Sequence, residues 1–210
     1  MRTIMLMNAK GGCGKTTLAT NIATWFADDS AKVALADFDP QGSTLDWLEA
    51  RQGYDGIPQI EGIDASRESP RPARGTDYLI MDAPAGTHGN TINQMLKRVE
   101  DLIIPVLPSP IDMRACNRFL DELLASGRVS RQQTRIAIVA NRTRENTRIY
   151  HQLEEFLGHL KIPFITHLRE SQNYIRAAER GLGIFELAPS MVWQDVEQWD
   201  PVFAWLKKGA

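Results

Sequence analysis

Residues 8–17 read Asn-Ala-Lys-Gly-Gly-Cys-Gly-Lys-Thr-Thr, and they hold the clearest chemistry in the chain. Three of the four residues from 11 to 14 are glycine, which leaves the backbone free to turn its N–H groups inward around an anion. Lys15 then supplies a cation for the β- and γ-phosphates of a nucleotide, and the hydroxyl of Thr16 is a suitable Mg²⁺ ligand. A plain glycine turn with surface lysines is the alternative, but few such turns would show this restrictive spacing.

The sequence on either side of this loop predicts a strand before it and a helix after it. Residues 4–7 are apolar at every position, as expected for a strand that is buried on both faces. Leu18, Ile22 and Phe26 then recur at helical spacing, and the helix is predicted to end near residues 28 and 29. A helix that begins at the loop adds its positive N-terminal end to the same anion site.

Acidic residues follow two further apolar runs. The run at residues 32–37 ends in Asp37-Phe38-Asp39-Pro-Gln-Gly, and the run at residues 77–82 ends at Asp82. The carboxyl ends of parallel strands face the ligand crevice of an open α/β sheet, so these side chains are expected near the phosphate loop. For Asp37 and Asp39 the alternative is turn and helix-cap chemistry before Ser43.

The remaining patterns predict strands that alternate with helices. Further strands are predicted at residues 57–63, 101–107, 134–140 and 163–166, and further helices at 43–52, 88–99, 113–126, 147–160 and 172–180. An amphipathic C-terminal helix over residues 192–206, broken near Pro201, completes the chain. We therefore expect one α/β domain over residues 1–210, with a mostly parallel, doubly wound sheet flanked by helices.

The loop K-G-G-x-G-K-T-T places Ala9 where the usual P-loop has its first glycine and adds an early lysine, Lys10. This pattern resembles the deviant P-loop of the ParA/MinD family of ATPases, and residues 101–115 (DLIIPVLPSPIDMRA) resemble the small, ParF-related partition proteins of that family. The resemblance covers nearly the whole chain and implies a single-domain P-loop NTPase.

The resemblance also implies a role for individual residues. Lys10 would reach the nucleotide of a partner subunit, Asp39 would position the attacking water, and Asn141 would recognise adenine. The ATP site would comprise Lys10, Gly11, Gly12, Cys13, Gly14, Lys15, Thr16, Thr17 and Asn141; Mg²⁺ would be held by Thr16, Asp37 and Asp82; and Pro84 and Gly86 would belong to switch II. The sequence after Asn141 is R-T-R rather than the K-x-D of guanine-binding proteins, which favours ATP.

By the same resemblance, the protein is expected to be a Mg²⁺-dependent ATPase that is slow unless a partner stimulates it. ATP would join two subunits into a sandwich dimer that binds DNA without sequence preference, and hydrolysis would reset the monomer. The partner would be a ParB-like or cargo-adaptor protein. The cargo would be a plasmid, a chromosome region or a protein organelle such as a carboxysome.

The net charge is −2, yet residues 128–148 contain six arginines and one acid, Glu145. A local basic face on a nearly neutral protein can bind nucleic acid weakly and switchably, and the alternative is a solvated arginine-rich surface. Basic residues here and in the late strand-to-helix segment are the candidates for phosphate contacts. They are Arg142, Arg144, Arg148, Arg169, Arg176 and Arg180.

Composition sets the expected compartment. The chain contains two cysteines, Cys13 and Cys116, and no evident signal peptide or apolar run near the ~20 residues that span a bilayer. We expect a cytoplasmic, nucleoid-associated protein with no metal site beyond Mg²⁺. The polar face of the C-terminal helix carries three acids against two lysines, so the helix is expected to pack on the sheet rather than on a membrane.

Two other functions remain open at this stage. One is a MinD-like ATPase that cycles on a membrane, against which the acidic C-terminal helix argues. The other is a small-molecule ligase or kinase on the same fold, resembling dethiobiotin synthetase, which would need an acceptor pocket. Lys10 and the D-x-D-P-Q sequence favour the partition function over both.

Overall fold

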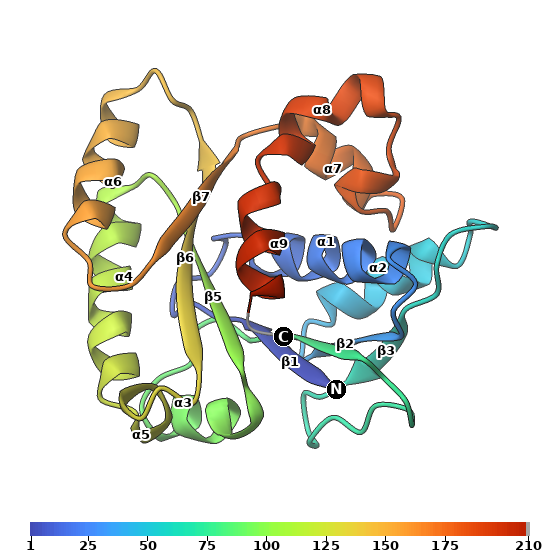
Figure 1. Ribbon diagram of the computed structural model, residues 1–210, viewed down its shortest axis with the longest axis horizontal. Coiled ribbons are helices and arrows are strands. Elements are labelled where there is room, and N and C mark those ends of the chain that lie inside the picture. The colour runs from blue at the N-terminus through green and yellow to red at the C-terminus, as the bar shows by residue number, and fades with distance from the viewer. Residues whose placement is uncertain (209–210) are drawn as a thin grey trace.

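The structure, a computed structural model, describes residues 1–208 and shows a sheet of seven strands that all run parallel (Figure 1). The strands are β1 (Arg2–Leu6), β2 (Val33–Asp37), β3 (Glu61–Asp64), β4 (Tyr78–Asp82), β5 (Asp101–Val106), β6 (Arg135–Thr143) and β7 (Phe164–Arg169). Their order across the sheet is β3-β2-β4-β1-β5-β6-β7. The predicted α/β fold with a parallel sheet is confirmed. The predicted domain also includes residues 209 and 210, which lie outside the described residues.

Helices cover both faces of the sheet. They are α1 (Lys15–Asp28), α2 (Ser43–Arg51), α3 (Asn90–Met95), α4 (Pro110–Leu124), α5 (Gly127–Ser130), α6 (Arg148–Gly158), α7 (Gln172–Ala178), α8 (Pro189–Glu197) and α9 (Asp200–Lys207). Two short 3₁₀ turns, η1 (Leu96–Arg98) and η2 (Ile184–Glu186), complete the elements. In Figure 1, α1, α2, α7, α8 and α9 lie on one side of the sheet, and α3, α4 and α6 lie on the other.

The apolar strand residues explain this two-sided arrangement. Successive side chains of a strand point to opposite faces, so a strand with helices on both faces needs apolar residues at every position. In β1, Ile4 and Leu6 pack in the cluster beneath α1 and α9, whereas Met5, and Met7 directly after the strand, pack in the cluster beneath α4. All four are fully buried, and the sheet therefore has one core on each face.

Some element boundaries differ from the sequence prediction. Helix α4 begins at Pro110, three residues early, because Ser109 is extended and proline is well suited to the first helical position. Strand β6 continues three residues beyond Ala140 to Thr143, with register shifts against β7. The predicted helix at 88–99 is only a short helix followed by the turn η1, and α5 had no clear signal in the sequence.

The C-terminal segment is two helices, and the break falls at residues 198–199, close to the predicted position near Pro201, which lies in the first turn of α9. Val202, Phe203 and Leu206 are buried, and the Phe203 ring stacks on Trp25 of α1 with centroids 3.8 Å apart. The apolar face of α9 therefore packs inside the fold, as predicted. Among residues 1–208, every helix is too short or too polar to span a bilayer.

Candidate nucleotide-binding site

The loop between β1 and α1 has the backbone conformation that its glycines permit. Gly12 and Gly14 have φ angles of 76° and 95°, which favour glycine, and Gly14 caps the N-terminus of α1. A Cβ atom on Gly14 would lie 2.1 Å from Nδ2 of Asn141, whereas a Cβ on Gly12 would meet no atom within 4 Å. Gly14 is thus required both by its backbone angle and by the close approach of β6.

Register places the two strand-end carboxylates side by side. Asp37 of β2 and Asp82 of β4 are partners in the parallel ladder, and Leu6, at the end of β1, is the next partner of Asp82. The Thr16 hydroxyl donates a hydrogen bond of 2.6 Å to Oδ2 of Asp82. Lys15 is almost fully buried in the same loop. The structure therefore brings together the residues predicted for phosphate and Mg²⁺ binding.

Asp82 is electrostatically unusual. Burial raises its pKa to about 7, an effect that the Thr16 hydrogen bond partly offsets and that the neighbouring Asp37 charge increases. Its other oxygen, Oδ1, is buried and has no hydrogen-bond partner among the described residues. A buried carboxylate with an unused oxygen beside a threonine hydroxyl suits a hard cation such as Mg²⁺.

The surroundings also fit Mg²⁺ in the number of protein ligands. Mg²⁺ usually takes only one or two protein carboxylates and completes its shell with water and substrate phosphates. Thr16 and Asp82 would likewise supply one hydroxyl and one carboxylate, and the second carboxylate, Asp37, lies beside Asp82 on the neighbouring strand.

Asp37 and Asp39 also make the turn and helix-terminus hydrogen bonds that the sequence allowed as an alternative role. Asp37 is fully buried, and its carboxylate accepts hydrogen bonds of 2.9 Å from the backbone N–H groups of Asp39 and Thr44. The second bond satisfies an N–H group in the first turn of α2 that has no partner within the helix. Asp39 accepts a bond from the N–H of Gln41. These bonds fix the turn that carries Asp39, so a structural role and a role near the nucleotide are compatible.

The segment after β4 touches the phosphate loop. The N–H of Gly86 donates to the carbonyl of Ala9 at 3.0 Å, and a Cβ atom on Gly11 would lie 3.6 Å from Cβ of Ala85. Pro84 is half-buried and its carbonyl accepts from the Thr87 hydroxyl. The Gly86 amide is therefore engaged, and it would have to leave Ala9 before it could bind a phosphate.

Asn141 supports the phosphate loop from β6. Its Nδ2 donates to the carbonyl of Cys13 at 2.8 Å, and its Oδ1 accepts from the N–H of Arg142. The family resemblance implies base recognition for this residue, and the structure adds a contact that braces the loop. A contact between residues 128 positions apart leaves no local signal. One Nδ2 hydrogen remains for a base.

A cavity of about 420 Å³ opens beside the glycines, next to Asn141. Gly12, Gly14 and Thr17 form one wall, and the start of α7, including Tyr174 and Ile175, forms the other. Its size lies within the range of small-molecule sites, and its apolar wall suits a planar base. The fold thus offers adjoining places for phosphates, a cation and a base.

Lys10 and Cys13 have contrasting environments. Lys10 is exposed, and its ammonium makes no hydrogen bond or ion pair with any residue between 1 and 208; its backbone N–H is held by Asn8. The Cys13 thiol is buried against the carbonyl of Lys10, and burial raises its pKa. A thiol of this kind is a packing group rather than a reactive one.

The candidate DNA-binding arginines fall into two groups. Arg142 and Arg144 both pair with Glu170, and Arg169 pairs with the fully buried Asp195. Their charges are therefore partly neutralised, which the sequence did not indicate. Arg148, Arg176 and Arg180 are exposed and have no ion pair with any described residue.

Fold and site together define a P-loop nucleotide-binding protein. The chain belongs to the CobQ/CobB/MinD/ParA nucleotide-binding domain family, whose model matches residues 4–184. The predicted membership in the ParA/MinD family is thereby confirmed.

Individual relatives are similar over much of the chain. The carboxysome distribution maintenance protein A of Halothiobacillus neapolitanus is 27% identical over 190 residues, which is 88% of this chain and 87% of the relative. The chromosome-partitioning ATPase Soj of Thermus thermophilus is 33% identical over 138 residues, about half of each chain (50% and 55%). MinD of Buchnera aphidicola is 27% identical over 226 residues, covering 87% and 83%.

Solved structures share the fold. The putative plasmid partition protein of Borrelia burgdorferi bound to AMPPNP superimposes with a TM-score of 0.74 at 18% identity and 99% coverage of both chains. Cyanothece apo McdA gives 0.73 at 18% identity, covering 94% and 97%. MinD of Pyrococcus horikoshii complexed with Mg-ADP gives 0.64 at 18%, covering 90% and 89%.

Proposed function

We propose that this protein is a Mg²⁺-dependent ATPase that positions a cargo in the cell by cycling between an ATP-bound dimer on DNA and a free monomer. The observation that carries the proposal is the contact between Thr16 of the phosphate loop and the buried Asp82, beside a buried Lys15. These groups are of the kinds that would hold the phosphates of a nucleoside triphosphate and its cation. The relatives that maintain carboxysome distribution and partition chromosomes support the positioning role.

Phosphoryl transfer needs alignment and charge neutralisation more than covalent help from the protein. Lys15 and the inward backbone N–H groups would hold the β- and γ-phosphates, and Thr16 and Asp82 would hold the cation. A bound Mg²⁺ would supply neutralisation of the phosphate charge. Asp39, in a turn fixed by Asp37, would orient the attacking water. The cation would also keep Asp82 ionised, because its charge opposes the burial that raises the Asp82 pKa.

Lys10 is suited to a role between subunits. Its side chain is exposed beside the phosphate loop and has no partner among the described residues, so it is available to a second copy. In the proposed dimer each Lys10 would bind the other subunit's nucleotide, and both loops would then be needed for assembly.

DNA binding would follow from dimerisation. A monomer with a few phosphate contacts binds weakly at cellular salt, and a dimer that joins two such faces gains from effective concentration. Arg148, Arg176 and Arg180 would contribute first, because Arg142, Arg144 and Arg169 are paired with acids. A ParB-like or cargo-adaptor partner would stimulate hydrolysis and return the protein to the monomer, which would associate only transiently with the nucleoid.

The test measures oligomeric state and DNA affinity without nucleotide and with ADP, ATP or a non-hydrolysable ATP analogue. We expect only ATP and its analogue to give a dimer and, with it, DNA binding at least about tenfold tighter than that of the monomer. Lys15→Ala should abolish nucleotide binding, whereas Lys10→Ala should keep it and abolish the dimer. Equal DNA affinity with and without ATP would contradict the switch.

A MinD-like membrane cycle is the second candidate, because MinD proteins are among the relatives. The apolar face of α9 is buried against α1 in this structure, so membrane binding through that face would require the helix to detach. Co-sedimentation with anionic liposomes in the presence of ATP separates the two candidates. A ligase or kinase would instead show turnover that depends on a small acceptor molecule.

A further inference from the structure

Helix α8 presents large apolar side chains to solvent. Trp193 is 60% exposed and Met191 is 49% exposed, although both residue types are usually covered in a folded chain. In Figure 1, α8 lies at the outer end of the molecule, away from the sheet. Tryptophan is enriched among the residues that contribute most to protein–protein binding, so this position is unusual for a side chain without a partner.

Trp193 forms one side of a groove of about 490 Å³ between η2, α8 and the start of α9. The groove is lined by apolar side chains of the segment 185–196, namely Phe185, Leu187, Pro189, Val192, Trp193 and Val196. A hollow of this size and composition can accept one or two apolar side chains from another molecule.

Beside the groove, a hollow that shares Trp193 and Glu197 contains Arg144 and Arg169, each paired with an acid, but the charged side chains of the groove itself have one sign. Glu197 and Asp200 are its two charged lining residues, both are exposed, and neither is ion-paired within residues 1–208. An apolar centre with an acidic rim complements a segment that carries apolar side chains next to Lys or Arg. We propose that this groove docks a short amphipathic, basic segment of a partner protein.

The same charges disfavour other occupants. A second copy seated on the same face would place two acidic rims opposite one another, and such like-charge contacts are unfavourable. Anionic lipid would be repelled by the rim as well, since membrane-surface helices need basic residues around their apolar face. A basic peptide segment meets neither obstacle.

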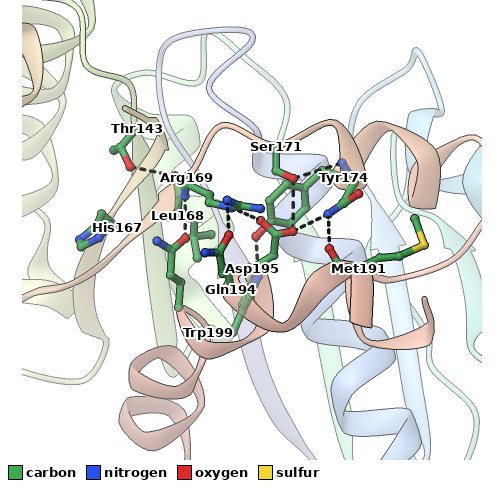
Figure 2. Close-up of polar contacts among 12 residues, drawn as sticks. Thr143, His167, Leu168, Arg169, Ser171, Tyr174, Met191, Gln194, Asp195 and Trp199 are labelled. Atoms are coloured by element: carbon green, nitrogen blue, oxygen red, sulfur yellow. Dashed lines mark hydrogen bonds and ion pairs between the residues drawn. The ribbon is translucent and has the colours of Figure 1, made fainter. Parts of the chain in front are cut away.

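Buried hydrogen bonds anchor the inner face of α8 to neighbouring segments, and they fix the position of the outer face before any partner binds. Asp195 is fully buried, and its carboxylate accepts hydrogen bonds from Arg169 and from the Ser171 hydroxyl (Figure 2). It also accepts a hydrogen bond of 2.7 Å from the Asn173 amide. The Asn173 amide also donates to the carbonyl of Met191 at 2.9 Å. Binding to a preorganised surface costs less ordering entropy.

The hydrogen bonds of Asp195 also connect α8, which forms the groove, to the nucleotide cavity. Ser171 and Tyr174 line the cavity beside the phosphate loop, and Ser171 bonds directly to Asp195 of α8. A partner segment on the outer face of α8 would therefore be linked to the proposed base site through the buried Asp195 carboxylate and its hydrogen bond with Ser171. The inference adds a partner surface to the proposed ATPase but does not depend on nucleotide binding.

The test uses the nucleotide-free protein and two synthetic helical peptides with the same leucine positions, one with lysines and one with glutamates on the polar face. Titration is followed by NMR and by intrinsic tryptophan fluorescence. We expect one-to-one binding of the lysine peptide that weakens with salt, at least about tenfold tighter than the glutamate peptide. Shifts should concentrate in residues 185–200.

Three variants make the result specific. Trp193→Ser should weaken the lysine peptide about tenfold or more, while Leu124→Ser, which removes an exposed apolar side chain on α4, should not. The double variant Glu197→Lys/Asp200→Lys should reverse the peptide preference. Equal binding of both peptides, binding unaffected by Trp193→Ser, or no saturable binding would each overturn the proposal.

The other occupants appear as distinct outcomes. Self-association of the nucleotide-free wild type that Trp193→Ser abolishes would assign the groove to a second copy. Trp193-dependent binding to phosphatidylglycerol vesicles would assign it to a membrane. Either result would overturn the peptide-docking proposal, and neither would bear on the ATP-dependent dimer, which is measured separately with the Lys10 and Lys15 variants.

Discussion

The Asp82 carboxyl is buried at the end of β4, against Thr16, and without a cation its charge is unfavourable there. Because burial raises its pKa from an ordinary 3.8 to about 7, the folded chain retains a proton that the unfolded chain releases between these values. The contribution of Asp82 to the free energy of unfolding is therefore most favourable below pH 4 and falls as pH rises to about 7.

We predict that Asp82→Asn removes this loss of stability with rising pH. The amide is neutral at every pH and can still accept from Thr16, so the nucleotide-free variant should exceed the wild type in free energy of unfolding at pH 8, by up to ~4 kcal/mol. At pH 4 the two proteins should be nearly equal. Urea unfolding from pH 4 to pH 8 measures the difference, with the exposed Asp121→Asn as control. Parallel curves for wild type and Asp82→Asn would refute the pKa assignment.

At the scale of elements, the phosphate loop and the end of β6 support one another. Asn141 reaches the carbonyl of Cys13 only because Gly14 has no side chain, since a Cβ there would collide with the amide. Gly12 has a similar backbone angle but open space around it. The two glycines therefore separate the effect of backbone strain from the effect of the contact with β6.

We expect Gly12→Ala to cost ~1 kcal/mol of stability through its positive φ alone. Gly14→Ala should cost ~2–3 kcal/mol and lose nucleotide affinity, because it also displaces Asn141 from its hydrogen bond. Urea unfolding and nucleotide titration of both variants provide the measurement. The double variant Gly14→Ala/Asn141→Ala should regain part of the stability. Equal costs at the two glycines, with no rescue, would disprove the bracing role of β6.

At the scale of the whole molecule, the net charge of −2 hides an uneven distribution. Arg142 lies near the end of β6 and Arg144 directly follows this strand. Glu170, the residue after β7, pairs with both arginines, which hold its pKa below the usual value, Arg142 most strongly. Glu170 also lines the cavity beside the phosphate loop. One acid thus partly neutralises the arginine surface that we propose binds DNA.

Glu170→Gln should release both arginines. We predict nonspecific DNA binding about three- to tenfold tighter at low salt, and a slope of log affinity against log salt that is steeper by about one to two. Filter binding or anisotropy at several salt concentrations gives both quantities. Glu155→Gln on α6 makes the same change in net charge and should have a smaller effect. The prediction fails if the two variants behave alike.

The sequence alone determined the parts of this protein that depend on local pattern. Runs that are apolar at every position predicted the parallel strands, and glycine, lysine and threonine at fixed spacing predicted the phosphate loop. Because parallel strands end at one edge of a sheet, the placement of Asp37 and Asp82 near Thr16 also followed from the sequence.

Tertiary structure decided the contacts between distant residues. Three such contacts join different elements across 26 or more residues of chain: Asn141 donates to Cys13, Arg142 pairs with Glu170, and Arg169 pairs with Asp195. Such contacts depend on strand order and helix packing, which no local periodicity encodes. The same holds for Trp193: helical spacing along 192–206 indicated an amphipathic helix, but only the packing of α8 and α9 determined which apolar side chains stayed exposed.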